Sequence, residues 1–394
     1  MDKSTTNRRL HALDILRGIT IAGMILVNNP GSYTFKYAPL HHAEWNGLTP
    51  TDLVFPFFMF IMGISTFLSL RKCDFLYSHA VGIKILRRTA LIFLISLCID
   101  WFSRFCYCWS TASMELTLYD KIWFSVNTFD RLRILGVLQR LALSYGAVAL
   151  IALWVKHKHI PYIVIGLLVG YWLLLWFGNG FAYDNTNILS KVDCALLTPA
   201  HMYVDHGMDP EGVLGTIPSI AHVLLGFWIG SLFLGAAKKN ECGNNLQYQL
   251  IVLFLAGVIL TFTGFLLSYG CPINKKVWSP TFVLVTCGFA SSLLGLLIWV
   301  IDVKGYKKWS VFFESFGVNP LFMYVFGTLL ATLFGYIHFS YEGVDVSIHD
   351  SFFQFWFQPL LGNEAASLLY AILFVLLNWC VAYFLYKRKI FIKL

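Results

Sequence analysis

Residues 37–60, YAPLHHAEWNGLTPTDLVFPFFMF, place two histidines, a glutamate, an asparagine and an aspartate directly before a wall of phenylalanine. The apolar run that begins here continues to residue 70. About 20 consecutive apolar residues suffice for a helix to cross the roughly 30 Å of hydrocarbon in a bilayer. The polar residues are therefore predicted to lie at the membrane face where this span begins.

The whole chain has the composition of an integral membrane protein. Of its 394 residues, 58% are apolar, 17% are aromatic and only 13% are charged, and the mean hydropathy is +0.67. A soluble chain of this length needs more charge to cover its surface. Backbone groups in lipid must be hydrogen-bonded within the span, and the runs lack the alternation of a membrane β-barrel, so we expect helices throughout.

The expected fold class is all-α, a polytopic bundle of about ten transmembrane helices. No fixed-period repeat and no Pro/Ser-rich linker divides the chain, so residues 1–394 are taken as a single transmembrane domain with no large soluble domain. The expected spans, placed to within several residues at each end, are 15–29, 51–70, 89–102, 134–155, 160–178, 215–236, 247–269, 280–301, 310–337 and 364–386.

Lysine and arginine predict the orientation. The ten-span order puts most of them on the side of the N-terminus, and cytoplasmic loops are enriched in these residues, so both termini are expected to be cytoplasmic. Loops that face anionic headgroups explain the net charge of +8, and no nucleic-acid partner is expected. The basic residues of that side are Lys3, Arg8, Arg9, Arg17, Arg71, Lys72, Lys84, Arg87, Arg88, Lys156, Lys158, Lys238, Lys239, Lys304, Lys307, Lys308, Lys387, Arg388, Lys389 and Lys393.

The nine cysteines show no metal-ligand spacing, so no metal is expected. Cys106 and Cys108 form the only close pair. Either of them can pair with Cys194 or Cys271 in an oxidising compartment. Free thiols are the favoured interpretation for most of the nine.

Two polar residues near the first outer loop are the leading candidates for chemistry. A neutral imidazole can take a proton from an amine or attack a thioester, which makes His42 a candidate general base or nucleophile. Asn28, at the end of the first span, can polarise or hold a carbonyl oxygen. A solvated loop histidine is nevertheless the commoner case, and the neighbouring His41 shares that alternative.

Five motifs together are similar to the heparan-α-glucosaminide N-acetyltransferase family, part of a wider group of transmembrane acyltransferases. They occur in matching order and extend over nearly the whole chain. They are HHAEWNGLTPTDLVFPFFMFIMG (41–63), RLRILGVLQRLALSY (131–145), DPEGVLGTIPSIAHVLLG (209–226), PINKKVWSP (272–280) and DVKGYKKWSVFFESFGVNPLFMY (302–324).

The resemblance implies transfer of acetyl from cytosolic acetyl-CoA, through the membrane, to the amine of glucosamine or of a terminal glucosaminide of heparan sulfate. The active-site histidine of the family lies in an H-A-x-W-N-G motif, which His42 matches in HAEWNG. The functional asparagine of the family, at the end of the first span, falls on Asn28. Acetyl-CoA is thus the expected co-substrate.

Only about fourteen residues precede the first expected span, whereas the lysosomal enzyme has a sizeable luminal domain there. The chain looks in this respect like the bacterial branch. The expectation is a multi-pass protein of the bacterial inner membrane, with its active-site mouth toward the periplasm. A heparan chain end, free glucosamine and another amino sugar all remain open as acceptor, and a homodimer remains open as oligomeric state.

Further residues are assigned supporting or binding roles. Asp52 or Glu44 can orient the imidazole or attract the sugar ammonium, and Asn46 lies just before Asp52. Asp52 also follows Pro50 and Thr51 in a pattern typical of a helix start, so a capping role stays open. The candidates for acceptor binding, which loop packing also explains, are Trp45, Asp209, Glu211, Asn274 and Trp278. The candidates for binding the phosphates of acetyl-CoA are Arg17, Arg87, Arg88 and Arg140.

Two chemical routes and two rival functions remain open at this stage. His42 acts either as a general base in a ternary complex or as a nucleophile that forms acetyl-imidazole. The main rival is a transporter of amino sugars or acetylated sugars, although no matched pair of interrupted half-chains is evident. The second rival is a membrane acyltransferase with another donor or acceptor.

Overall fold

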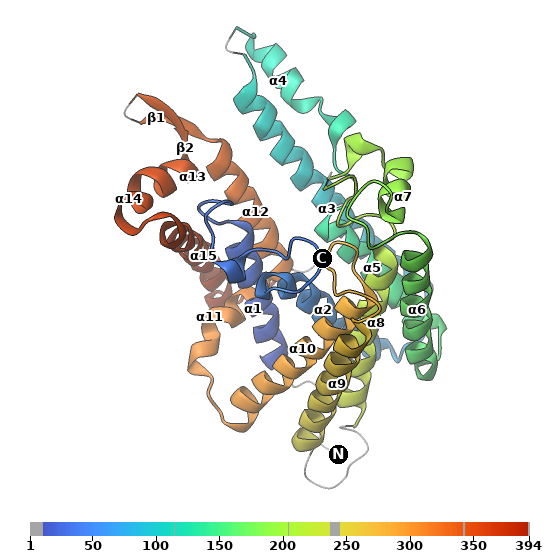
Figure 1. Cartoon of the computed structure of the whole chain (residues 1–394). Helices are drawn as coiled ribbons and strands as arrows, with labels where there is room; N and C mark the ends of the chain where they lie inside the picture. The colour runs from blue at the N-terminus through green and yellow to red at the C-terminus, as the bar shows by residue number, and fades with distance from the viewer. Residues whose placement is uncertain (1–10, 114, 204, 237–244, 342, 393–394) are drawn as a thin grey trace.

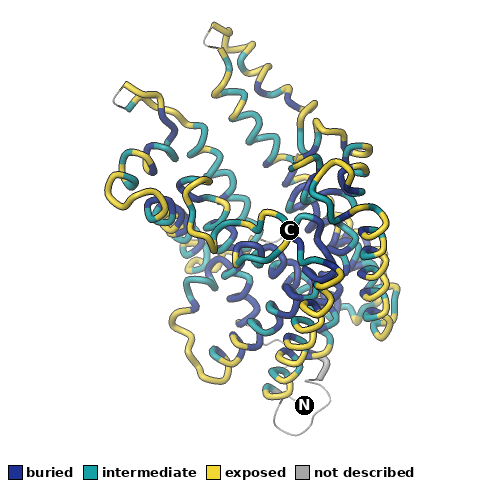
Figure 2. The backbone as a smooth tube through the Cα atoms, in the orientation of Figure 1, coloured by how far each residue is buried: buried dark blue, intermediate teal, exposed yellow. Residues whose placement is uncertain are grey.

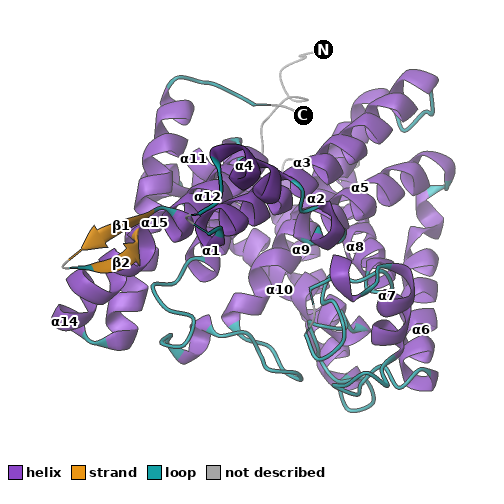
Figure 3. Ribbon diagram, turned by 90° about the horizontal axis from the view of Figure 1, so that it is seen from above, coloured by secondary structure: helices purple, strands orange, loops and turns teal. Residues whose placement is uncertain are grey.

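The computed structural model describes residues 11–113, 115–203, 205–236, 245–341 and 343–392. Their regular secondary structure is helical except for one antiparallel hairpin, in which His338 pairs with Ser347 and Tyr341 with Val344 (Figures 1 and 3). The predicted cytoplasmic residues that lie outside the described ranges are Lys3, Arg8, Arg9, Lys238, Lys239 and Lys393.

The elements follow one another along the chain in a simple order. The main helices are α1 (His11–Asn28), α2 (Val54–Leu70), α3 (His79–Thr111), α4 (Leu118–Val126), α5 (Val137–Trp154), α6 (Ile160–Phe177), α7 (Ile188–Leu196), α8 (Thr216–Ala236), α9 (Asn245–Leu267), α10 (Pro280–Ile298), α11 (Val311–Val318), α12 (Pro320–Tyr336) and α15 (Asn363–Lys387). The shorter elements near the C-terminal end are β1 (His338–Tyr341), β2 (Val344–Ser347), α13 (Ile348–Asp350) and α14 (Gln358–Leu361).

The all-α polytopic fold predicted from the sequence is confirmed. In the described part of the chain, eight helices are long and apolar enough to cross a membrane, namely α1, α2, α5, α6, α8, α9, α10 and α15. A ninth candidate is the pair α11 and α12, which is bent by 79° at the break between them. The remaining predicted span, 89–102, lies inside the long helix α3, which is not among these candidates. Its apolar run is bounded by Arg87, Arg88 and Arg104 and contains Asp100.

The spans differ in how much of their surface the protein covers (Figure 2). In its most apolar stretch, α8 is 72% buried, whereas α9 is only 17% buried. The side chains that α9 leaves exposed are large and apolar, as expected of a helix that faces lipid. They include Ile251, Leu255, Val258, Ile259, Phe262 and Leu266.

Glycines let the central helices approach closely. The helix α2 packs against α8, and Gly63 and Gly226 lie at this crossing. A Cβ atom on Gly226 would lie 2.3 Å from the carbonyl oxygen of Phe60. Small residues of this kind allow membrane helices to pack backbone against backbone. The crossing fixes the helix that begins directly after Asp52.

The loops at one end of the bundle meet over α2. The amide of Gly47 donates to the carbonyl of Ile273 at 2.8 Å, and the indole of Trp45 donates to the carbonyl of Phe181 at 3.0 Å. The loops before α2, after α6 and before α10 are thereby joined. Beyond them, α3 with α4 and the hairpin β1–β2 rise as two separate projections at the top of Figure 1. The candidate site lies in the joined loops.

Candidate active site

Asp52 is the buried residue around which the candidate site is built. It occupies the third position of the short 3₁₀ turn Pro50–Leu53 that leads into α2, and its side chain is fully buried. One carboxylate oxygen, Oδ2, accepts hydrogen bonds from the backbone N–H groups of Ala43 and Thr49, both at 3.1 Å. These bonds cap the turn and fold the loop back over it, so the capping role expected for Asp52 is present.

The other carboxylate oxygen holds His42. Asp52 Oδ1 lies 2.6 Å from Nδ1 of His42. An ionised carboxylate only accepts hydrogen bonds, so Nδ1 must carry the proton of this bond. The second ring nitrogen, Nε2, is then left unprotonated in the neutral imidazole and is available to a substrate. The His42 side chain is 47% exposed, which allows such contact.

Lys275 is the third member of the group formed with His42 and Asp52. It was not singled out as a site residue from the sequence. Its Nζ lies 3.0 Å from Nδ1 of His42 and 3.2 Å from Oδ1 of Asp52. Burial lowers the pKa of Lys275, and the nearby charge of Asp52 acts in the opposite direction. The only signal was its place in the motif PINKKVWSP, where the neighbouring Asn274 and Trp278 were chosen instead.

The predicted residue Asn274 shapes the loop that carries Lys275. It is fully buried, and its Oδ1 accepts from the backbone N–H of Val277 at 3.1 Å. Its Nδ2 donates to Oδ1 of Asn46 at 3.3 Å, which links the two loops. Asn46 and Asn274 therefore act on His42 through the backbone that they hold.

His41 and Glu44 lie beside this group and are not bonded to His42 in the described part of the chain. Nε2 of His41 lies 3.1 Å from the carbonyl oxygen of Lys36, and Glu44 is exposed. The contact with Asp52 therefore distinguishes His42 from its neighbour His41.

A second charged group joins the loop between α7 and α8 to Arg133, in the segment just before α5. Arg133 donates to both carboxylate oxygens of Asp209, at 2.6 and 3.1 Å, and to Glu211 at 2.6 Å. Burial acts to raise the pKa of Glu211, but the positive charges of Arg133 and Arg140 outweigh it and lower that pKa. Asp209 is fully buried, whereas Glu211 keeps partial exposure. Arg133, like Lys275, was not singled out from the sequence.

The two tryptophans predicted to bind the acceptor are packing residues in this structure. The ring of Trp45 stacks on Tyr183 with centroids 4.4 Å apart. Trp278 is fully buried, with the Phe55 ring 5.4 Å away and the guanidinium of Arg140 5.2 Å from its ring. A direct sugar contact is therefore closed to Trp278 here.

Arg140 corrects one expectation about the donor. It was predicted, with Arg17, Arg87 and Arg88, to bind the donor phosphates, but it is fully buried and donates to the carbonyl of Gly212, at 3.2 Å, in the loop that carries Glu211. Two of its guanidinium nitrogens, Nε and Nη1, lack a hydrogen-bond partner among the described residues. It therefore lies beside the loop that carries Glu211, and its burial leaves it no solvent-facing contact for a phosphate.

The other three arginines lie elsewhere. Arg17 forms the ion pair with Asp14 that their spacing allows, at 2.7 Å, and also donates to Ser65 at 2.8 Å. Arg87 and Arg88 are exposed on α3, and the guanidinium of Arg88 lies 4.8 Å from the centre of the Tyr145 ring. These three residues remain candidates for the donor phosphates without a common site in the structure.

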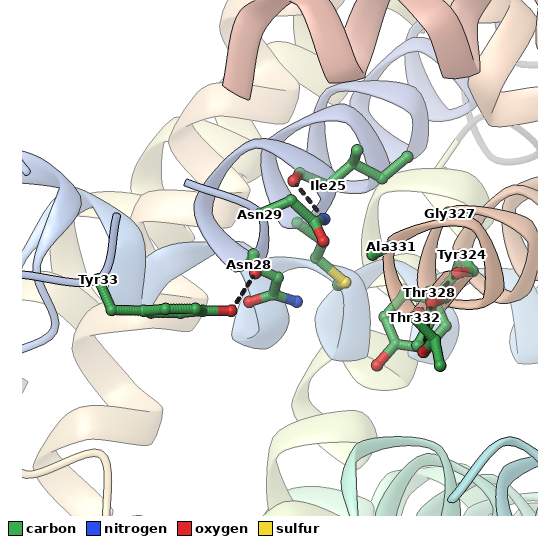
Figure 4. Close-up of a pocket in the computed structure, with 10 residues that line it drawn as sticks. Ile25, Asn28, Asn29, Tyr33, Tyr324, Gly327, Thr328, Ala331 and Thr332 are labelled. Atoms are coloured by element: carbon green, nitrogen blue, oxygen red, sulfur yellow. Dashed lines mark hydrogen bonds between the residues drawn. The ribbon is translucent and has the colours of Figure 1, made fainter. Parts of the chain in front are cut away.

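Asn28 lines a cavity of about 300 Å³ between α1 and α12. Figure 4 shows its amide pointing toward α12, where Tyr324, Thr328 and Thr332 bring three hydroxyl groups into the wall. The main-chain oxygen of Asn28 accepts from the hydroxyl of Tyr33 at 2.8 Å. His42 is not among the residues that line this cavity. The full lining is Met24, Ile25, Asn28, Asn29, Tyr33, Tyr324, Gly327, Thr328, Ala331 and Thr332.

The eight described cysteines are all free thiols, including Cys106, Cys108, Cys194 and Cys271. Within the described ranges, no three His, Cys, Asp or Glu side chains are grouped so that they could hold a metal ion.

Comparison with known proteins identifies close relatives in sequence. The chain is 30% identical to the human heparan-alpha-glucosaminide N-acetyltransferase, over 98% of the chain and 60% of the human protein. It is 29% identical to the mouse protein of the same name, over 100% of the chain and 61% of the mouse protein. The chain thus spans about three fifths of the length of these curated relatives. No family model matches it.

Proposed function

Because the chain belongs to the heparan-α-glucosaminide N-acetyltransferase family, we propose that it is a transmembrane acetyltransferase. In this proposal, acetyl passes from cytosolic acetyl-CoA to the amine of glucosamine, or of a terminal glucosaminide, on the other side of the membrane. The observation that carries it is the bond between His42 Nδ1 and the buried Asp52 Oδ1, 2.6 Å long, at the end of an apolar bundle. A base in this position is open to water yet adjacent to the membrane.

As a general base, His42 acts on the attacking amine. The sugar ammonium first loses one proton to water, and the neutral amine nitrogen then attacks the thioester carbonyl of acetyl-CoA. Nε2 of His42 takes the proton released from that nitrogen, the carbon–sulfur bond breaks, and CoA leaves as the thiolate. Asp52 stabilises the imidazolium that forms and holds the ring in one orientation.

As a nucleophile, the same nitrogen forms a covalent intermediate. Nε2 of His42 attacks the thioester carbon and CoA leaves as the thiolate, which gives acetyl-imidazole. The sugar amine then takes the acetyl group, loses a proton to water or a nearby base, and restores the imidazole. Both routes require an unprotonated Nε2, so the geometry supports them equally.

For the donor, we propose that the cavity beside Asn28 receives the thioester end of acetyl-CoA. Its amides and hydroxyls match the amide-rich pantetheine arm, and Asn28 would donate to the thioester carbonyl. Arg17, Arg87 and Arg88 are the proposed partners of the nucleotide phosphates. The reaction then needs no passage of CoA itself across the bilayer.

For the acceptor, the partly exposed carboxylates Glu44 and Glu211 are the proposed partners of the sugar ammonium. Trp45, Asp209, Asn274 and Trp278 would shape the acceptor site indirectly, through the loops they fix. We propose the bacterial inner membrane as the location, with the His42 side toward the periplasm. A monomer and a homodimer both agree with these residue roles.

The first test is acetyl transfer by purified protein in detergent, supplied with acetyl-CoA and either glucosamine or a terminal heparan glucosaminide. Mass spectrometry follows the N-acetylated sugar for the wild type, for His42→Ala and for the matched control His41→Ala. The wild type and His41→Ala should give product. The rate of acetyl transfer by His42→Ala should be lower by about 100-fold or more, because a general base usually contributes at least that much to the rate. Equal product from a folded His42→Ala would remove His42 from the mechanism.

The same preparation separates the two routes and the rival function. Acetyl found on the His42 peptide after incubation with acetyl-CoA alone would establish the nucleophilic route. One observation favours transport instead, because the break between α11 and α12 resembles the interrupted helices of transporters. Uptake of glucosamine into proteoliposomes without acetyl-CoA, with no acetylated product from either acceptor, would replace the proposed function by transport.

A further inference from the structure

Lys275 places a positive charge beside the proposed catalytic histidine from a loop 233 residues away in the sequence. We propose that Lys275 is a positioning residue that offsets the negative charge of Asp52 beside the imidazole of His42. The inference rests on the proposed function for the chemical role of His42. The charge relation itself is a property of the three side chains and is measured separately.

The proton on Nδ1 of His42 decides which of the three side chains are hydrogen-bonded to each other. Nδ1 of His42 has one position for a hydrogen bond, and both Asp52 and Lys275 lie within reach of it. At 2.6 Å from a carboxylate oxygen, Nδ1 must be the donor, because two lone pairs would repel each other there. Lys275 therefore donates to Oδ1 of Asp52, at 3.2 Å, and lies against the imidazole without a bond to it.

The electrostatic consequence follows from the signs of the charges. A buried carboxylate bonded to a histidine favours the imidazolium form of the ring. An ammonium 3.0 Å from the ring nitrogen disfavours a second positive charge there. Asp52 alone would thus favour the imidazolium, in which Nε2 carries a proton and can neither accept one nor attack a thioester. Lys275 removes this obstacle and keeps the orienting bond.

The other charged groups around the site do not offset the charge of Asp52 beside His42. Glu44 is exposed on the same loop as His42, where water screens it. Glu211 acts on Lys275 and favours its charged form, as Asp52 does. The neighbouring Lys276 is turned away to an ion pair with Asp205 at 2.7 Å. Lys275 is therefore the described cation in contact with His42.

The test measures the protonation of His42 by a route that does not need activity. Diethyl pyrocarbonate modifies unprotonated imidazole, and tandem mass spectrometry separates His42 from His41 on the same peptide. The extent of modification is followed across pH 5 to 9 for the wild type and for Lys275→Met, Lys275→Arg, Asp52→Asn and the matched control Lys276→Met. His41, whose ring contacts the Lys36 carbonyl, is the internal reference.

The expected result is a set of shifts with opposite signs. Lys275→Met should move the His42 midpoint to higher pH, and Asp52→Asn should move it to lower pH. Lys275→Arg keeps the charge and should stay near the wild type, as should Lys276→Met. The His41 midpoint should be constant throughout. An unchanged or lowered His42 midpoint in Lys275→Met, with thermal unfolding like that of the wild type, would overturn the inference.

Activity adds a second reading that separates this inference from the proposed function. If the protein transfers acetyl, the acid limb of kcat/KM should move upward in Lys275→Met together with the modification midpoint. A purely structural lysine would instead lower the rate at all pH values without moving the limb. If the wild type transfers no acetyl, the modification data still decide whether Lys275 controls the charge of His42.

Discussion

Asp52 illustrates how one residue serves both the fold and the site. Its Oδ2 accepts from two backbone N–H groups, and its Oδ1 contacts His42 and Lys275. A carboxylate has about four lone-pair positions, so these roles do not compete. The capping bonds hold the carboxylate still, and that rigidity fixes the direction of the imidazole. Capping and orientation, which the sequence offered as alternatives, coexist.

At the same scale, Asp193 predicts a pH dependence of stability. This α7 residue is fully buried, and burial raises its pKa to about 6. The folded state then binds the proton more tightly than the unfolded chain, so stability falls as pH rises from about 4 to about 6 and levels off above that range. The full effect is on the order of 3 kcal/mol.

Asp193→Asn should remove most of this slope in the thermal unfolding midpoint, measured in detergent between pH 4 and 7. Asp184→Asn is the control, because bonds from Thr186 lower the pKa of Asp184 and it titrates below this range. Equal slopes in Asp193→Asn and the wild type would show that Asp193 does not titrate in this range.

At the scale of elements, the break between α11 and α12 has a clear local cause. Proline at position 320 cannot donate to the preceding turn, and Asn319 leaves the helical conformation there. The amide of Asn319 then bonds the backbone of Ile390 and Ile392, both at 2.8 Å. At the break, hydrogen bonds within the helix are thus replaced by hydrogen bonds to the C-terminal segment. The sequence motif around Asn319 did not predict this partner.

The α2–α8 crossing gives a prediction at this scale. In Gly226→Ala the new Cβ would meet the carbonyl oxygen of Phe60, so the helices must separate at a cost of about 1–3 kcal/mol or more. The unfolding temperature and the yield of folded protein should both fall. Gly166→Ala on α6, where a Cβ meets nothing within 4 Å, is the matched control and should leave both unchanged or higher. Equal effects of the two substitutions would contradict close packing at the crossing.

At the scale of the whole molecule, the burial pattern separates central helices from helices at the lipid boundary. The helices α1, α2, α5, α8 and α10 are mostly buried, whereas α6, α9 and α15 expose most of their apolar stretches. Exposed apolar surface of this extent would be unstable in water and indicates contact with the bilayer. The joined loops at one end then become the part of the molecule that a polar acceptor can reach.

The proposed orientation is tested by labelling single cysteines in a cysteine-free background. Glu44→Cys, in the His42 loop, should react with an impermeant maleimide added outside intact spheroplasts. Lys307→Cys, in the exposed turn before α11, should react only after the membrane is permeabilised, because basic loops stay in the cytoplasm. A thermal unfolding midpoint like that of the wild type would confirm the fold of each variant. The reverse labelling pattern would invert the proposed topology.

The sequence by itself determined the helical membrane fold and the polar stretch on which the site is built. Hydropathy over about 20 residues and the cap before α2 are local properties, so they can be read along the chain. The resemblance in motif singled out His42 and Asn28, but their roles remain predictions. Only the tertiary structure placed Lys275 beside His42, Arg133 between Asp209 and Glu211, and Trp278 in the core. These contacts depend on which distant helices pack together, and that packing is decided by the shapes of whole helix faces rather than by any local pattern.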